Sequence, residues 1–329
     1  KYAAYCMSKT AIAQYGFILK QTVAALGIPT RVFSVHPGRM KTAMGAENGQ
    51  IEAAESAEGI YRLAVGEVLA DNKEIYVDYR GTAMLHQAGR KEDGFVWGAA
   101  TASYQVEGAV TEGGRGLTVW DEFARMPGKT FSGHTGDVAA DHYHRYAEDV
   151  AIMKALGLKA YRFSVAWSRI LPQGYGAVNE EGLRFYKNLV DELVKNGIEP
   201  YVTLFHWDLP YGLYRIGGWQ NPAITDYFAE YARIVAEYLG DKVKHYITFN
   251  EPQCFIGLGH VTGEHAPGNI MSRRAVLEMA HHVLLAHGKA TKVLRKVAPH
   301  AKIGYAPTCS AHYPYTQKQE DVEAARKAT

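Results

Sequence analysis

The chain has 329 residues, of which 47% are hydrophobic and 21% charged, a composition typical of globular proteins and unlike that of disordered ones. Its formal net charge is only +2, without the basic excess that phosphate binding requires, so we expect no nucleic-acid partner. No apolar run reaches membrane-spanning length, so we expect no membrane association.

The cysteines are three in number and widely spaced, at Cys6, Cys254 and Cys309. An odd, scattered set indicates neither a disulfide framework nor a zinc site. We therefore expect a reducing, cytoplasmic location, and neither a metal nor another cofactor.

Residues 1–92 show helical and strand-like patterns in alternation. Apolar side chains recur at helical spacing in two stretches, and each stretch is followed by a short apolar run. This order is typical of the C-terminal part of an open, Rossmann-like α/β fold. The predicted elements are helix 4–26, strand 30–35, helix 53–69 and strand 73–78.

A domain boundary is expected close to residue 92. All five tryptophans follow it, and the polar stretch 87–94 resembles a linker. We therefore predict one segment over 1–92 and a second domain over 93–329.

The second domain alternates strands and helices more regularly. Its predicted strands are apolar almost throughout, as expected for a parallel sheet with both faces buried. This alternation predicts either a doubly wound sheet or a (β/α)₈ barrel. The strands are predicted at 95–100, 158–165, 199–205, 245–249 and 302–306, and the helices at 143–156, 179–196, 222–239 and 273–297.

Polar residues at the ends of successive strands favour the barrel. Arg162 lies near the end of one strand, His206 and Trp207 follow the next, and Asn250 and Glu251 follow a third. In a (β/α)₈ barrel the carboxyl ends of the strands form the rim where chemistry occurs. The pattern therefore predicts an active site at this rim.

Glu251 is the candidate catalytic carboxyl. Glycoside cleavage needs an acid to protonate the leaving oxygen and a second carboxylate on the other side of the sugar. A Glu at the mouth of an apolar barrel would be partly desolvated, which raises a carboxyl pKa. Taken alone, the Asn-Glu-Pro sequence favours an ordinary helix start with Glu at its N-terminus.

His206, Trp207 and Gln105 are candidates for sugar binding. The imidazole and amide can exchange hydrogen bonds with hydroxyls, and the indole offers a flat apolar face. Each has a purely structural alternative, namely a core histidine beside a packing tryptophan, and a loop glutamine.

Four motifs in order resemble glycoside hydrolase family 1, the β-glucosidase family. They are FVWGAATASYQ at 95–105, YRFSVAWSR at 161–169, LFHWDLP at 204–210 and TFNEP at 248–252. The resemblance is continuous from about residue 93 to residue 329.

The resemblance implies a retaining β-glycosidase that acts on small β-glucosides without metal or cofactor. It assigns Glu251 as acid/base and Arg162 as the residue that orients the nucleophile. It assigns the glycone subsite to Gln105, His206, Trp207 and Asn250, with Asn250 at the 2-hydroxyl.

The nucleophile of this family lies in a Glu-Asn-Gly motif at the end of strand seven. We predict only strands one to five here, so we expect an incomplete barrel, a missing nucleophile and self-association through exposed barrel edges. The one such tripeptide, at 47–49, does not follow an apolar strand, and we interpret it as a surface turn. The first residue is Lys1, which indicates a processed chain or a fragment.

The first segment has a resemblance of its own. Tyr5 and Lys9 lie one helical turn apart, and VFSVHPG at 32–38 and Thr42 follow. Together they resemble the C-terminal part of a short-chain dehydrogenase/reductase, over about 1–85. By that resemblance Tyr5 donates the proton, while Lys9 lowers its pKa and holds the ribose. The glycine-rich loop would lie upstream, so we expect a remnant or fusion partner.

Two alternatives to the glycosidase stay open. One is an NAD(P)-dependent oxidoreductase remnant, and the other is an inactive fused or truncated product.

Overall fold

A computed structural model of the chain describes residues 34–36, 53–65, 76–78, 80, 96–308 and 312–328. The chain divides into two compact units, Lys1–Phe95 and Val96–Thr329, which are taken separately below. The predicted helix 4–26, the Tyr5/Lys9 pair and the 47–49 turn lie outside the described residues.

The first unit contains a pair of parallel strands, and a helix connects them along the chain. Ser34 pairs with Tyr76 and His36 with Asp78. The helix and the second strand lie within the predicted ranges 53–69 and 73–78, and the first strand extends one residue beyond the predicted range 30–35. They are β1 (Ser34–His36), α2 (Ala53–Val65) and β2 (Tyr76–Asp78).

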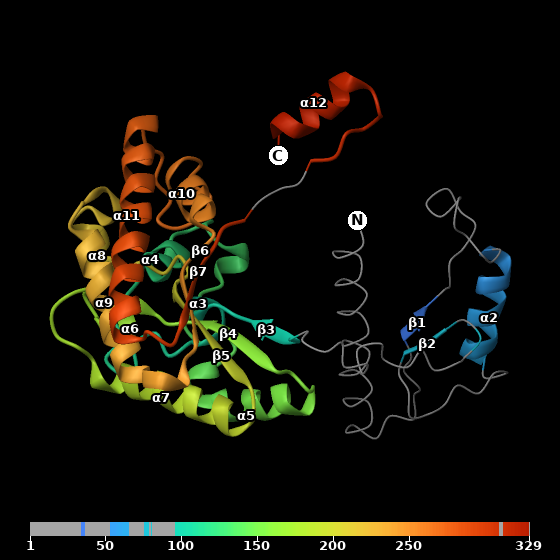
Figure 1. The fold of residues 1–329 in the computed structure, drawn as a ribbon, viewed down its shortest axis with the longest axis horizontal. Helices are drawn as coiled ribbons and strands as arrows, with labels where there is room; N and C mark the ends of the chain where they lie inside the picture. The colour runs from blue at the N-terminus through green and yellow to red at the C-terminus, as the bar shows by residue number, and fades with distance from the viewer. Residues whose placement is uncertain are drawn as a thin grey trace. The chain divides into compact units, whose positions relative to one another are not determined.

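The second unit is built on a five-stranded, all-parallel sheet in which the strands follow the order of the chain (Figure 1). A strand–helix–strand sequence with neighbouring strands always adjacent is the arrangement of a (β/α)₈ barrel. The five strands lie at the positions predicted from apolar periodicity. They are β3 (Gly98–Ala100), β4 (Ala160–Ser164), β5 (Glu199–Phe205), β6 (His245–Asn250) and β7 (Lys302–Ala306).

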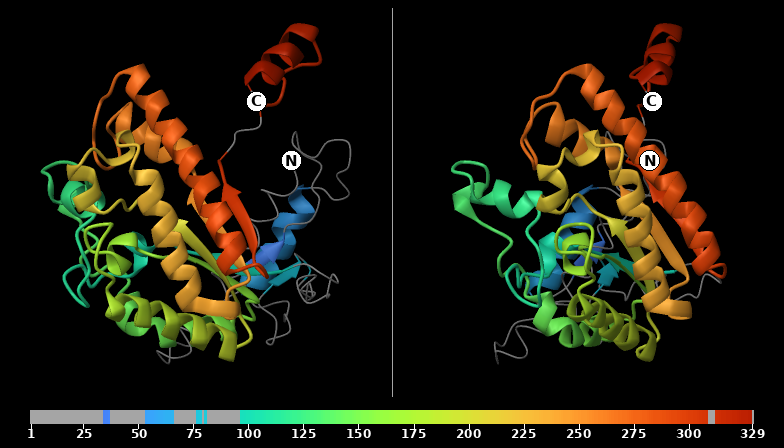
Figure 2. Two further views of the ribbon diagram at one scale, coloured as in Figure 1. Left: turned by 60° about the vertical axis from the view of Figure 1, so that its left-hand side comes forward. Right: turned by 90° about the vertical axis from the view of Figure 1, so that its left-hand side faces the viewer.

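Four long helices cover one side of this sheet. Neighbours along the chain pack against each other, and α7, α9 and α11 lie side by side in both views of Figure 2. Asn179 caps α7 by accepting from the Glu181 N–H, and Ser272 caps α11 by accepting from the Ala275 N–H. The helices are α5 (His142–Ala155), α7 (Glu180–Lys195), α9 (Ile224–Leu239) and α11 (Arg273–Val297).

Shorter helices occupy the connections that follow the strands, except for η3, which lies between α9 and β6. α4 begins at a capping box in which Thr118 and Asp121 exchange hydrogen bonds. These elements are α3 (Ser103–Val106), α4 (Val119–Arg125), η1 (Phe131–Gly133), α6 (Trp167–Ile170), α8 (Tyr211–Arg215), η2 (Gly218–Gln220), η3 (Gly240–Lys242) and α10 (Pro252–His260); a final helix, α12, spans Gln319–Ala328.

The core lies between the central strands and the long helices, and it is strongly aromatic. Phe228 and Phe249 stack with ring centroids 4.5 Å apart, and Trp219 packs edge-on against Phe249 at 5.5 Å. Burying each such ring contributes about 1.5–3 kcal/mol relative to leaving it in water. This cluster fixes the positions of β5 and β6, whose ends carry the candidate site.

The expectation that every strand is buried on both faces is correct for the central strands and wrong at the margins. In β6, Thr248, Phe249 and Asn250 are buried, whereas all three residues of β3 are exposed. β3 pairs with β4 and β7 with β6, and no further strand joins either one within residues 96–308. An edge strand loses the burial that a second neighbour would give.

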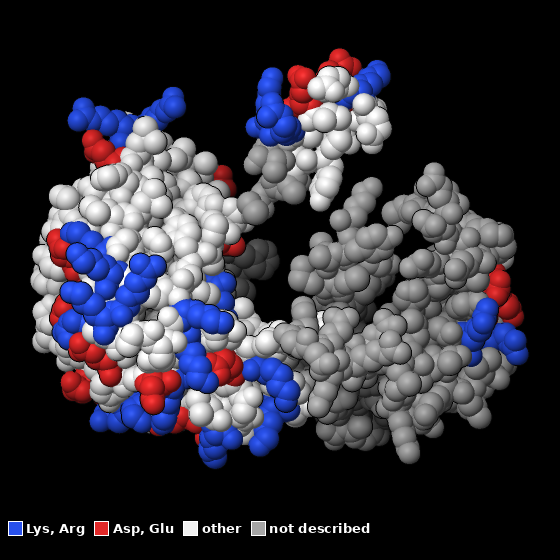
Figure 3. Space-filling view, viewed as in Figure 1, with Lys and Arg blue, Asp and Glu red and all other residues white. Residues whose placement is uncertain are grey.

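Charged side chains of the second unit do not form a single-sign stripe on the face shown in Figure 3. Around α5 and α7 the basic and acidic groups are interspersed. Within the described residues, no helix is both long and apolar enough to cross a membrane.

Candidate active site

The ends of β4, β5 and β6 bring the candidate residues together. Arg162 lies on β4, His206 and Trp207 directly follow β5, and Asn250 ends β6. Since the three strands are parallel neighbours, their carboxyl ends lie at one edge of the sheet. Direct hydrogen bonds then connect these four residues into one network.

Glu251 lies at an unusual backbone position. Its φ and ψ are 43° and 62°, in the left-handed region that non-glycine residues rarely adopt. The β6–β7 register shifts between Ile247 and Asn250, and irregularities of this kind re-aim side chains next to functional sites. The Glu251 N–H donates to the Ala306 carbonyl at 2.7 Å, which holds the residue against β7.

Both sequence interpretations of Glu251 describe its position. It follows the last residue of β6 and is also the N-cap of α10, with Pro252 in the first turn. The residue is half-buried. The Cys254 thiol is hydrogen-bonded to its side chain, and burial together with the Glu251 charge raises the pKa of that thiol. Cys254 therefore stays protonated, a partner that sequence reasoning missed.

Arg162 is anchored at two points. Its Nε donates to Thr203 Oγ1 at 2.9 Å, and its Nη2 donates to Asn250 Oδ1 at 2.6 Å. Burial lowers the pKa of Arg162, and the Glu251 charge raises it in part. The guanidinium thus fixes the orientation of the Asn250 amide and places positive charge near Glu251.

The Asn250 amide in turn fixes the proton on His206. Because Asn250 Oδ1 accepts from Arg162, its Nδ2 must donate to His206 Nε2, which lies 3.0 Å away. A neutral His206 therefore carries its proton on Nδ1. Burial, with Arg162 as the second cause, lowers the pKa of His206 to about 4, so the ring is neutral near pH 7.

His206 Nδ1 is buried and has no hydrogen-bond partner within the described residues. An unpaired buried donor of this kind costs about 1–3 kcal/mol.

Trp207 connects the ends of two strands. Its Nε1 donates to the Asn250 carbonyl at 2.9 Å, and its backbone φ is 78°. The ring lies 5.5 Å from the His265 ring, tilted by 40°. The half-buried indole offers the flat apolar surface that a sugar ring requires.

Gln105 is on α3, the short helix after β3, and it is exposed. The structure does not hydrogen-bond it to the other candidates. Its helix is held by Ser103, whose N–H donates to Ser164 Oγ at 2.7 Å and whose Oγ donates to Asp208 Oδ2 at 2.6 Å. Gln105 is thus connected to the rim only through the backbone of α3, which the Ser103 hydrogen bonds hold in place.

Asp208 is a site-region residue that the sequence analysis missed. It is 1% exposed, and burial raises its pKa to about 6, partly opposed by the hydrogen bond from Ser103. The available signal was its place directly after His206 and Trp207. Burial of an aspartate is not visible from periodicity.

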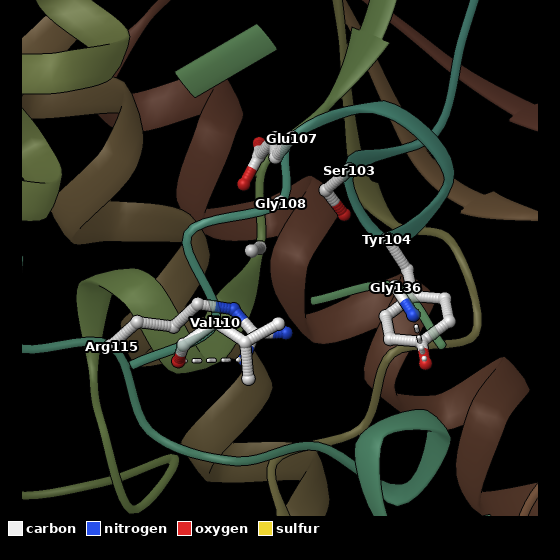
Figure 4. Close-up of a pocket in the computed structure, with 8 residues that line it drawn as sticks. Ser103, Tyr104, Glu107, Gly108, Val110, Arg115 and Gly136 are labelled. Atoms are coloured by element: carbon white, nitrogen blue, oxygen red, sulfur yellow. Dashed lines mark hydrogen bonds between the residues drawn. The ribbon is translucent and has the colours of Figure 1, made fainter. Parts of the chain in front are cut away.

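A second buried network supports α3 from behind. Glu107 accepts from Arg169 Nε at 3.1 Å and from the Tyr186 hydroxyl at 2.5 Å. Figure 4 shows Glu107, Ser103 and Tyr104 around a narrow space opposite Arg115. The space is too narrow for a water-sized sphere, so the residues around it are closely packed.

The described residues contain no group of three or more His, Cys, Asp or Glu side chains placed to hold a metal ion. The rim instead combines a half-buried carboxyl, a neutral imidazole donor, an amide, a guanidinium and an indole face. That set suits recognition of a neutral polyhydroxylated ring and proton transfer to it.

Comparison with known proteins agrees with this chemistry. The family model of Glycosyl hydrolase family 1 matches residues 88–329. Beta-glucosidase A of Acetivibrio thermocellus is 53% identical over 231 residues, which cover 70% of this chain and 51% of that protein. Beta-glucosidase A of Thermotoga maritima is 47% identical over 234 residues, 71% of this chain and 52% of that protein.

Solved structures of a β-glucosidase resemble the second unit in fold. The Thermotoga maritima β-glucosidase in complex with glucoimidazole superimposes with a TM-score of 0.69 at 47% identity, covering 71% of this chain and 53% of that one. Its complex with deoxynojirimycin gives 0.68. The five parallel strands are therefore those of a partial (β/α)₈ barrel, and the chain spans about half the length of the relatives it matches.

Proposed function

Since this chain belongs to glycosyl hydrolase family 1, we propose that it carries the acid/base half of a retaining β-glucosidase active site. The proposed substrates are small β-glucosides, cleaved at the O-glycosidic bond. The names of the β-glucosidase relatives and the complex of the Thermotoga maritima enzyme with glucoimidazole support this substrate class.

Each rim residue has a proposed part in the reaction. Glu251 protonates the leaving oxygen and later activates water. His206, Asn250 and Gln105 bind glycone hydroxyls, and the Trp207 ring lies along the C–H face of the sugar. Arg162 orients the nucleophilic carboxylate, which must lie about 5 Å from Glu251 in a retaining enzyme.

The observation that carries this proposal is the bonded series Arg162–Asn250–His206 beside Glu251. It leaves His206 Nδ1–H without a hydrogen-bond partner in the described part of the chain. The second carboxylate is proposed to come from a segment that supplies strands six to eight.

The test is hydrolysis of a nitrophenyl β-glucoside by the 329-residue chain, with Glu251→Gln as the test variant and Glu264→Gln, an exposed glutamate, as the matched control. If the chain is active, hydrolysis should be lost in the first variant alone. If the chain itself is inactive, glucose binding followed by NMR should be weakened by Asn250→Ala and unaffected by Glu264→Gln. Undiminished hydrolysis by Glu251→Gln, or glucose binding insensitive to Asn250→Ala, would contradict the proposal.

We propose that residues 1–85 are a non-functional remnant of a short-chain dehydrogenase/reductase. The Tyr5/Lys9 spacing and the VFSVHPG motif support the origin, and the scattered cysteines support a cytoplasmic location. The chain should pass unretarded through a nucleotide-affinity resin. Retention that is lost in Lys9→Ala would favour the oxidoreductase alternative.

The unpaired edges of β3 and β7 are proposed sites of self-association. Each has a hydrogen-bonding row without a strand partner in the described part of the second unit, and such edges recruit other strands. Size-exclusion chromatography should show an apparent mass that rises with concentration. A monomer at all concentrations would argue against this.

A further inference from the structure

A buried series of hydrogen bonds joins the ends of three neighbouring strands. Ser103 and Asp208 each lie three residues beyond the end of a strand, β3 and β5, and Ser164 is the last residue of β4. Their exposures are 3%, 1% and 1% in the order Ser103, Ser164 and Asp208. The series therefore links segments that are far apart in the sequence, in a part of the second unit that is closed to solvent.

The carboxylate at the end of this series fixes the direction of each hydrogen bond. Ionised Asp208 can only accept, so the Ser103 hydroxyl donates to its Oδ2, at 2.6 Å. The Ser164 hydroxyl then donates to Ser103 Oγ at 3.0 Å, and Ser164 Oγ accepts from the Ser103 N–H at 2.7 Å. Both the backbone and the side chain of Ser103 are therefore held in place.

Burying Asp208 is energetically costly, because the carboxylate loses its hydration and gains no counter-ion among the described residues. Arg115 lowers the pKa of Asp208 only in part, and the ion pair of Arg115, 2.9 Å long, is with Asp121. For packing alone, an apolar residue of similar size would cost less at this position. A carboxylate offers instead a strong, charge-assisted hydrogen bond to the Ser103 hydroxyl, which indicates a role in placing α3.

The short helix α3 depends on such contacts for its position. It has only four residues, and its N-cap, Ala102, makes no side-chain capping bond, so it has little stability of its own. Ser103 holds its first residue, and Glu107, at its C-cap, belongs to the buried network with Arg169. Gln105 lies between these two anchors.

We propose that Asp208 is a positioning residue for the glycone subsite. By holding Ser103 it holds α3, and so places the Gln105 amide. Because Asp208 directly follows Trp207, it connects the sugar-binding end of β5 to α3. This role rests on the proposed function, which assigns Gln105 to glycone hydroxyls. Without the connection, Gln105 would sample several positions, and part of the binding energy would go into ordering it.

The first test needs no ligand. The side-chain amide signals of Gln105 in ¹H–¹⁵N spectra, assigned with Gln105→Ala, report whether α3 keeps its position. We expect Asp208→Ala to shift and broaden these signals. Ser103→Ala removes the same hydrogen bond from its other side and should act alike, so it serves if Asp208→Ala does not fold. Asp208→Asn, whose amide oxygen can still accept from Ser103, should largely restore the signals.

Leu193→Ala is the matched control for stability. It removes a fully buried side chain of α7, which destabilises the second unit without touching the series. The Gln105 signals should stay unchanged in this variant. Signals that are indifferent to both Asp208→Ala and Ser103→Ala, or that change equally in Leu193→Ala, would overturn the proposal.

The second test is a double-mutant cycle on glucose binding, followed by NMR titration. Asp208→Ala and Gln105→Ala should each weaken binding by about fivefold, as for one lost hydrogen bond. The double variant should bind no more weakly than Gln105→Ala alone. Additive losses would mean that Asp208 acts by a route other than Gln105, which contradicts the proposal. If glucose does not bind the unaltered chain while the Gln105 signals respond to Asp208→Ala, the proposed function fails and the positioning of Gln105 by Asp208 is supported.

Discussion

The indole nitrogen of Trp207 lies 2.9 Å from the backbone carbonyl of Asn250, so a side chain that follows β5 is bonded to the last residue of β6. The same asparagine bonds Arg162 and His206 through its side chain. Asn250 is thus the common partner of the rim, and disturbance at any of the three neighbours should reach Glu251 beside it.

Replacing Trp207 by Phe should weaken glucose binding at the rim by about fivefold, corresponding to roughly 1 kcal/mol for the lost hydrogen bond. Phe retains an apolar ring but cannot donate to the Asn250 carbonyl. NMR titration with glucose measures the change. Trp167→Phe is the control, because that indole is bonded to Gly174 in the core; an equal loss there would show that the effect is one of general stability.

Replacing Arg162 by Lys should alter the tautomer of His206. An ammonium does not reproduce the guanidinium fork that bonds Thr203 and Asn250 together. With the amide released, the proton of His206 should distribute between both ring nitrogens. ¹⁵N spectra of the ring report this directly, and a His206 that keeps its proton on Nδ1 in the variant would disprove the mechanism described for Asn250.

The pH dependence of folding should show two opposing contributions below neutrality. His206 has a pKa of about 4 in the folded chain and about 6.5 when unfolded, so the unfolded state binds more protons between these values. Its contribution to stability is therefore present above about pH 6.5 and lost as the pH falls to about 4. Asp208, with its pKa raised to about 6, contributes stability that is present below about pH 4 and lost as the pH rises through about 6.

Two variants should separate these contributions, each on the order of 3 kcal/mol. Asp208→Asn should leave a chain that loses stability on acidification from about pH 6.5 to about pH 4. His206→Gln should leave one that gains stability over the same range. Urea unfolding at several pH values gives the slopes, and slopes of the same sign in both variants would refute the assignment.

Replacing Arg169 by Met should destabilise the second unit by about 3–5 kcal/mol, because Glu107 would remain buried without its counter-ion. The side chains of this pair are 0% and 5% exposed. Adding Glu107→Met should recover much of the loss, as measured by urea unfolding of the single and double variants. Arg233→Met, which breaks an exposed pair with Glu230, should cost less than about 1 kcal/mol; equal costs would mean that burial does not set the energy.

The order and type of the elements could be predicted from the sequence, because apolar periodicity records which residues face the core. The bounds of β5, α11 and β7 agree with the predicted ranges. β6 extends one residue further than predicted and includes Asn250, which is buried at 5% exposure and bonded on both sides. The apolar pattern ends at Asn250 because its side chain is polar. The strand nevertheless includes this residue, because Arg162 and His206 form hydrogen bonds with its amide.

The order of the motifs also predicted that one rim carries Arg162, His206, Trp207, Asn250 and Glu251, since neighbouring parallel strands have their carboxyl ends at the same edge. The sequence by itself therefore determined the family, and it predicted the barrel strands and the candidate residues of the rim. Only the tertiary structure decided the left-handed backbone of Glu251, the proton position on His206, the burial of Asp208 and the exposure of β3. These properties depend on contacts between residues far apart in the chain, whose distances and solvent access no local pattern contains.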